Sequence, residues 1–166
     1  MRDAAGDRAS GGTAGHTVRD LQDTLVRIMR PELLPQSKAA GVDTASKEDL
    51  ASLRQALGTL PSESGLAGFD RNVVADYQLD PFLRGIERVR ASGHFQVYAK
   101  VGQAYGFLIA NAYVVDKDTG RSFFLIASVY ANPDETMNDD QYAYDTISFP
   151  ALADVGEAFC RHAFEP

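Results

Sequence analysis

The sequence has few of the residues from which small proteins build cross-links and metal sites. It contains one cysteine, Cys160, so no disulfide can form within the chain, and its three histidines are dispersed rather than spaced as metal ligands. Tryptophan is absent, and no apolar run approaches the roughly 18 residues that a membrane-spanning helix needs. We therefore predict no metal, no cofactor and no membrane span, and we expect Cys160 to be a buried apolar residue.

Positive charge is also scarce. Lys and Arg number 16 against 23 Asp and Glu, which gives a formal net charge of −7, and no basic run interrupts the chain. Such a surface repels a phosphate backbone, so a nucleic-acid partner is not expected. The charge does not distinguish a cationic small molecule from a basic protein surface.

Residues 1–16 differ in composition from the rest of the chain. They are rich in Gly, Ala, Ser and Asp and contain no apolar segment typical of a secretion signal, so we predict a flexible leader. Residues 17–166 are expected to form one domain, since the chain has ordinary globular values of 45% hydrophobic and 23% charged residues. The compartment is not determined by these features.

Helix signals dominate the first half of this domain. Capping-box patterns begin at Thr17 and Ser46, and each is followed by apolar residues at helical spacing. Pro31 and Pro61 then end the two predicted helices. The segment 61–72 has the composition of a loop.

Two more helices are predicted further along. Asp80 followed by Pro81 is typical of a helix start, with Asp80 as the N-cap. The last helix is expected over about Pro150 to Phe164. An acidic loop, Asn132 to Asp145, precedes it; its acidic residues lack the spacing of a calcium-binding loop.

Between these helices the pattern changes to that of strands. From Phe95 to Val101 apolar and polar residues alternate, and the runs Phe107–Val115 and Phe123–Ala131 are joined by a turn-forming segment, 116–121. Apolar residues on both faces of these runs indicate a sheet covered by helices on each side. The fold class is α+β, with an antiparallel sheet of three C-terminal strands flanked by helices.

A K-x-G triplet, Lys100-Val101-Gly102, ends the first predicted strand and is followed by a hairpin and a terminal helix. With the strings KVGQAYGFLIANAYV and FFLIASVYAN, it resembles the C-terminal part of class A β-lactamases and penicillin-binding proteins, most of all a branch described only as serine hydrolase. The resemblance covers roughly residues 17–164. It implies the second half of the β-lactamase/transpeptidase fold and an extracytoplasmic location.

The resemblance also implies roles for three residues. Lys100 would place positive charge near a substrate carboxylate, Gly102 would let the substrate approach the strand, and the backbone N–H of Gln103 would complete an oxyanion hole. We expect Lys100 to share a strand face with Tyr98 and Gly102. The alternative for Lys100 is an ordinary solvent-exposed lysine. Val101 departs from the family pattern, because a threonine there would offer a hydroxyl group.

The nucleophile of that family is missing from this sequence. No serine is followed by a lysine three residues later, and no S-D-N triplet occurs. Tyr130-Ala131-Asn132 matches a Y-x-N variant in letters, but it follows the K-x-G instead of preceding it, and we interpret it as coincidence. We therefore predict no catalytic residue in this chain and a domain that is incomplete as a hydrolase. The alternative is a noncatalytic module that binds a ligand or completes another chain.

The third predicted strand, Phe123–Ala131, is apolar, uncharged and free of proline. In the family that it resembles, this strand pairs with a strand from the N-terminal region. We expect its open edge to mediate self-association or to accept a strand from a partner chain.

Overall fold

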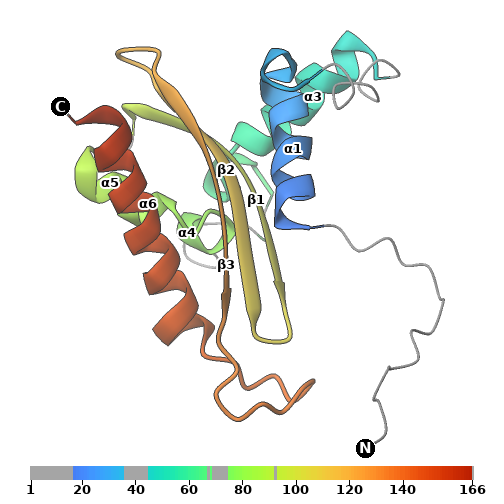
Figure 1. The fold of residues 1–166 in the computed structure, drawn as a ribbon, viewed down its shortest axis with the longest axis vertical. Coiled ribbons are helices and arrows are strands. Elements are labelled where there is room, and N and C mark those ends of the chain that lie inside the picture. Colours follow the sequence, from blue (N-terminus) through green and yellow to red (C-terminus); the bar gives the residue numbers. More distant parts are fainter. Residues whose placement is uncertain (1–16, 36–44, 67, 69–74, 92, 166) are drawn as a thin grey trace, which may run out of the picture.

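The computed structural model describes residues 17–35, 45–66, 68, 75–91 and 93–165. The predicted leader, residues 1–16, and part of the predicted loop 61–72 lie outside them. The described elements form three layers, with a central sheet and helices on both of its faces (Figure 1). The expected α+β class with a three-stranded antiparallel sheet is confirmed.

The sheet contains β1 (Phe95–Ala104), β2 (Phe107–Asp116) and β3 (Ser122–Tyr130), in the order β1-β2-β3. Both pairs of neighbours are antiparallel, as the predicted hairpins require. Among the described residues, β1 and β3 are therefore the two edge strands.

A two-residue turn, Tyr105-Gly106, joins β1 to β2. Both residues have positive φ, 50° and 85°, as a type I′ hairpin turn requires. Gly106 is also needed for space, because a Cβ atom there would lie 2.7 Å from the Cβ atom of Asn132. The turn sets the register, with Ala104 opposite Phe107.

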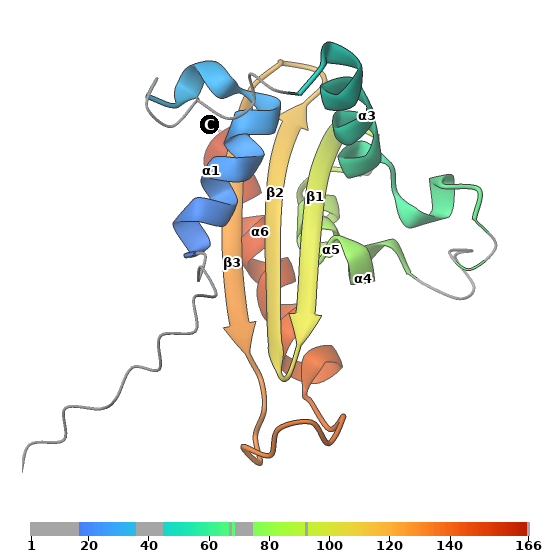
Figure 2. The ribbon, with the colours of Figure 1, turned by 90° about the vertical axis from the view of Figure 1, so that its right-hand side faces the viewer.

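Helices α1 (Val18–Met29) and α3 (Lys47–Gly58) cover one face of the sheet (Figure 2). Both predicted capping boxes are present: the Thr17 hydroxyl accepts from the backbone N–H of the third helical residue at 3.2 Å, and the Ser46 hydroxyl does so at 3.0 Å. Short 3-10 turns, η1 (Pro31–Leu33) and η2 (Pro61–Glu63), follow these helices. The predicted helix ends are confirmed.

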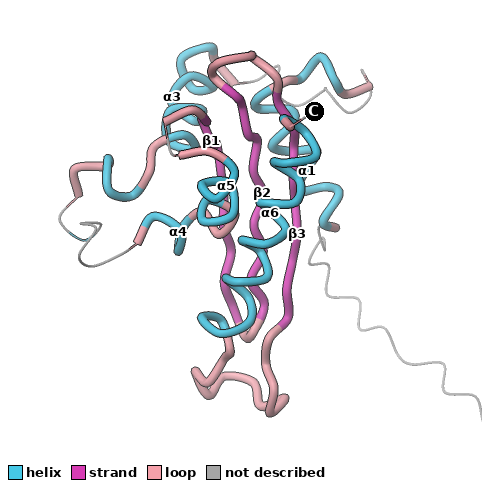
Figure 3. Tube along the Cα trace, turned by 90° about the vertical axis from the view of Figure 1, so that its left-hand side faces the viewer, coloured by secondary structure: helices cyan, strands magenta, loops and turns pink. Residues whose placement is uncertain are grey.

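Helices α5 (Leu83–Val89) and α6 (Phe149–Phe164) cover the opposite face (Figure 3), and a short π-helix, η4 (Tyr144–Ser148), leads into α6. The core lies between them and the sheet, and Cys160 is fully buried in it, as expected. Burial raises the pKa of its thiol to about 11. None of the helices in the described ranges is long and apolar enough to cross a membrane.

One predicted helix start is wrong. Asp80 and Pro81 form a turn, and α5 begins at Leu83, whose N–H donates to the backbone carbonyl of Asp80. A short helix that the sequence patterns did not predict, α4 (Asp76–Leu79), precedes this turn beside β1. The turn places the Asp80 carboxylate inside the protein rather than at an exposed helix end.

The crossing of α5 and α6 depends on two glycines. A Cβ atom on Gly85 would lie 1.7 Å from the carbonyl oxygen of Ala153, and one on Gly156 would lie 2.7 Å from the carbonyl oxygen of Phe82. The two helix backbones are therefore in direct contact. This contact holds α6 in place over the sheet.

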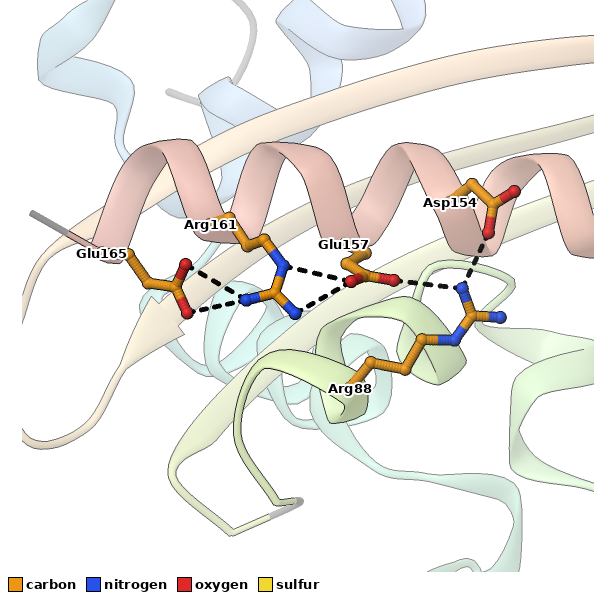
Figure 4. Close-up of polar contacts among 5 residues, drawn as sticks. All are labelled: Arg88, Asp154, Glu157, Arg161 and Glu165. Atoms are coloured by element: carbon orange, nitrogen blue, oxygen red, sulfur yellow. Dashed lines mark hydrogen bonds and ion pairs between the residues drawn. The ribbon is translucent and has the colours of Figure 1, made fainter.

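Ion pairs reinforce the same helix pair at its surface (Figure 4). Arg88 of α5 bridges Asp154 at 2.7 Å and Glu157 at 3.1 Å, and Arg161 links Glu157 and Glu165 along α6, both at 2.9 Å. Exposed pairs of this kind contribute little to stability, because water and salt screen the charges. The backbone contact between the helices is the stronger constraint.

A buried ion pair ties the end of β2 to the end of α5. Burial favours a higher pKa for the Asp116 carboxyl, but the backbone N–H of Asp118 and the guanidinium of Arg90, at 2.8 Å, more than offset it and hold the pKa below its usual range. Asp116 thus remains ionised and paired. The pair fixes the β2–β3 turn against the helix layer.

Candidate functional site

The three residues expected to bind substrate lie near the end of β1, next to the hairpin turn. β1 is an edge strand among the described elements, so one side of Lys100, Gly102 and Gln103 has no neighbouring strand there. Lys100 lies on the sheet face covered by α1 and α3, as does Gly102, whereas the side chain of Gln103 points to the other face. The expected common face of Lys100, Tyr98 and Gly102 is confirmed.

The hairpin register determines which backbone groups of β1 form no hydrogen bond with β2. The pair Ala104 and Phe107 closes a two-residue turn, so it is hydrogen-bonded, and every second pair along the ladder is hydrogen-bonded likewise. The bond from the Ala131 N–H to the Gly106 carbonyl, 2.8 Å, agrees with this alternation. The N–H and C=O groups of Gln103 and Val101 therefore point away from β2, toward the open edge of β1.

Lys100 borders two neighbouring cavities, which also share Leu57 and Val101 in their linings. The first, which we call the Asp80 cavity, has a volume of about 250 Å³ and lies between β1 and the α3–η2 segment. The second, the α1 cavity, has a volume of about 330 Å³ and lies between α1 and the sheet. The ammonium group of Lys100 donates to the carbonyl of Val101 at the strand edge.

Asp80, which borders the first of these cavities, has an unusual carboxylate. Asp80 is 3% exposed, and neither of its carboxylate oxygens accepts a hydrogen bond of normal geometry. Burial raises the pKa of this carboxyl to about 7, although the nearby N–H groups of Phe82 and Leu83 act in the opposite direction. Because those N–H groups form no proper hydrogen bond with the carboxylate, desolvation dominates.

Ser64 borders the same cavity as Asp80 and Lys100, so its chemistry matters here. Its hydroxyl donates to the carbonyl of Pro61 at 2.7 Å. No hydrogen bond links it to a lysine or histidine in the described part of the chain. The arrangement therefore lacks the nucleophile–base contact from which acyl transfer starts.

The side chain of Gln103 faces a third, more polar cavity of about 490 Å³ at the hairpin end of the sheet. Asp140, Asp145 and Tyr144 also border it, and the Tyr144 hydroxyl accepts from the N–H of Gly106 at 2.7 Å. This bond anchors the acidic loop to the hairpin. The two carboxylates make this side of the edge unfavourable for an anion, whereas the Lys100 side is favourable.

The α1 cavity holds a residue that the sequence patterns did not single out. Asn111, on β2 directly opposite Lys100, donates its Nδ2 group to the carbonyl of Leu21 at 2.9 Å, while its buried Oδ1 atom accepts no hydrogen bond. One signal was available in the sequence, since Asn111 is the single amide within the apolar run Phe107–Val115. Its position facing a cavity, by contrast, depends on the packing of α1.

Protein-family models, curated proteins and solved structures gave no match. The function of the chain is accordingly inferred from the geometry of the β1 edge and its cavities.

Proposed function

We propose that this domain forms the substrate-binding wall of a β-lactamase-like serine hydrolase and lacks the nucleophile. The observation that supports the proposal is the placement of the K-x-G triplet on an edge strand, with the N–H of Gln103 directed away from the sheet. An edge N–H next to a lysine can hold a substrate carbonyl and a carboxylate at the same time. The nucleophile would come from polypeptide outside these 166 residues.

Each residue has a distinct part in this proposal. Lys100 attracts the carboxylate of the ligand, and Gly102 has no side chain to block its approach to the strand. The N–H of Gln103 donates to the substrate carbonyl oxygen. Val101 offers no hydroxyl group, and its side chain packs against the apolar core, so carboxylate binding falls to Lys100 alone.

The alternative function is a noncatalytic module that binds a ligand or completes another chain. Within the described residues Ser64 forms no hydrogen bond with a basic side chain, which favours a domain that binds a ligand without catalysing a reaction. The two functions share the β1 edge and differ in whether a covalent intermediate forms. A binding experiment on this chain therefore tests the β1 edge that the two functions share.

The test has two measurements on the whole chain. Incubation with a chromogenic cephalosporin and a fluorescent penicillin should give neither turnover nor a covalent adduct by mass spectrometry. Titration with a penicillin, followed by amide NMR, should shift the N–H signals of Gly102 and Gln103 reversibly. Lys100→Ala should weaken this binding about tenfold or more, and Lys117→Ala, which removes a lysine from the far end of the sheet, should not.

Two results would contradict the proposal. An adduct on a serine of this chain would make the domain catalytic by itself. Amide shifts that do not include Gly102 or Gln103, or that are unchanged in Lys100→Ala, would show that the ligand does not bind at the β1 edge.

A further inference from the structure

One half of a sheet face carries no described helix. α1 and α3 lie over the half of this face where β1 begins and β2 ends, and none of the described helices lies over the half next to the hairpin turn (Figure 2). Positions 107 and 111 of β2 both point to this face, because every second residue of a strand does so. Asn111 contacts α1 through the carbonyl of Leu21, whereas Phe107 is 50% exposed. The helix layer therefore ends between these two positions.

The side chains at the uncovered half are aromatic and exposed. Phe107 and Tyr130 are directly opposite each other in β2 and β3, and their ring centroids are 4.5 Å apart. Tyr130 is 47% exposed, and Tyr105 in the hairpin turn is 52% exposed. Single exposed apolar residues are common on protein surfaces, but a group of them indicates an interaction site. We call Tyr105, Phe107 and Tyr130 the hairpin surface.

The loop next to the hairpin surface is acidic. Residues 132–145 include five Asp and Glu, and residues 122–160 contain no Lys, Arg or His. The Tyr144 hydroxyl accepts from the N–H of Gly106 at 2.7 Å, which holds the loop at the hairpin turn, and Figure 1 shows it passing beneath that end of the sheet. Among the described residues, its carboxylates form no ion pair. The hairpin surface is therefore bordered by uncompensated negative charge.

Charge and dimensions together select the partner. The acidic loop repels nucleic acid and anionic lipid, and a second copy of the chain would bring a second acidic loop to the same place. From position 107 to position 111 a strand rises about 13 Å, at about 3.3 Å per residue. Apolar positions i and i+7 of a helix are about 10.5 Å apart. A short helix with one apolar face therefore matches the uncovered half of the sheet.

We propose that the hairpin surface binds a basic amphipathic helix of a partner protein. Apolar side chains of that helix pack on Phe107 and Tyr130 and continue the helix layer that α1 begins, while its Lys and Arg side chains face the acidic loop. The surface needs neither Lys100 nor the N–H of Gln103. It is therefore independent of the function proposed for the β1 edge.

The test uses two matched probes, measured by fluorescence anisotropy with the whole chain. One is a labelled model helix of about four turns that has Leu on one face and Lys on the other, and the second has Glu in place of every Lys. The Lys probe should bind, and its affinity should fall as the salt concentration rises. The Glu probe should bind at least about tenfold more weakly, because its charge has the same sign as the loop.

Phe107→Ser tests the apolar contact, with Phe159→Ser as its control. The two rings are equally exposed, 50% and 49%, but Phe159 lies on α6, on the opposite side of the sheet. Phe107→Ser should weaken binding of the Lys probe about tenfold or more, because a central aromatic contact is lost. Phe159→Ser should bind the probe as the wild type does.

A pair of double variants tests the charge. Glu135→Gln/Asp140→Asn removes two exposed charges of the acidic loop, and Glu48→Gln/Glu87→Gln removes two exposed charges elsewhere. The first should weaken binding of the Lys probe about two- to fivefold, since each exposed charge contributes modestly. The second should have a smaller effect. The comparison of the two probes on the wild-type chain does not depend on the folding of any variant.

Several results would overturn the proposal. Absence of binding, or equal affinity of the two probes, would mean that the acidic loop does not select a basic helix. Unchanged affinity in Phe107→Ser would reduce the binding to attraction by the net charge of −7. If neither probe binds and Phe107→Ser abolishes self-association in analytical ultracentrifugation, a second copy covers this surface instead. Lys100→Ala should leave binding of the Lys probe unchanged, so failure here and failure at the β1 edge are distinguishable.

Discussion

Replacing Asp80 with asparagine should make the stability of the protein less dependent on pH. The pKa of the Asp80 carboxyl rises from its usual value of 3.8 to about 7 in the folded chain, chiefly because the group is buried. Between these two values the unfolded chain has released a proton that the folded chain keeps. Stability contributed by this group is therefore present at low pH and is lost as the pH rises from about 4 to about 7.

The size of the effect follows from the shift. Each pKa unit corresponds to about 1.4 kcal/mol, so a shift of about three units makes a difference of about 4 kcal/mol across the whole range. Between pH 5 and pH 8 this group accounts for a loss of about 2–3 kcal/mol in the free energy of unfolding. An asparagine side chain cannot ionise. The free energy of unfolding of Asp80→Asn, relative to that of the wild type, should therefore rise by this amount between pH 5 and pH 8.

The assay is urea unfolding at pH 5, 6.5 and 8, with Asp145→Asn as the control. Asp145 is exposed, so its substitution should leave the pH dependence of stability close to that of the wild type. If the stability curves of the wild type and Asp80→Asn run parallel from pH 5 to pH 8, the carboxylate is solvated or paired in the folded chain and the reasoning fails.

Three further predictions concern single positions. Lys100→Ala should change the free energy of unfolding by less than about 1 kcal/mol, since an exposed charge contributes little; a larger loss in urea unfolding would make Lys100 a structural partner. The wild-type chain should self-associate through the edge of β3, and Ile126→Lys should reduce this association, as measured by analytical ultracentrifugation. A monodisperse wild-type monomer at tens of micromolar would refute this prediction. Gly85→Ala should destabilise the protein by roughly 3 kcal/mol or more, because its Cβ atom would lie 1.7 Å from the carbonyl oxygen of Ala153, and a normal melting temperature would contradict that contact.

Elements with strong local signals were predicted well. The capping boxes at Thr17 and Ser46 and the prolines at 31 and 61 set the helix limits that the structure shows. The alternation from Phe95 to Val101 predicted β1 and the face on which Lys100 lies, and the two apolar runs joined by a turn-forming segment predicted β2 and β3. These signals are local, because a cap or an alternation involves residues only a few positions apart.

The start of α5 shows where local signals fail. Asp80 followed by Pro81 has the chemistry of a helix start, yet the packing of α5 on α6, through Gly85 and Gly156, places the helix two residues later. The Asp80 carboxylate then lies in the interior. No pattern in the sequence distinguishes an exposed cap from this buried carboxylate, since its burial depends on segments that are distant in the sequence, among them α3 and β1, which border the same cavity.

The amino-acid sequence by itself determined the kinds of elements, their approximate limits and the position of the K-x-G triplet on a strand. The tertiary structure decided that β1 and β3 are edges among the described strands, that Gln103 directs its N–H outward, and that Asn111 faces a cavity. The reason is physical. Backbone conformation follows largely from neighbouring residues, whereas burial, cavities and unpaired polar atoms arise only when distant segments pack together.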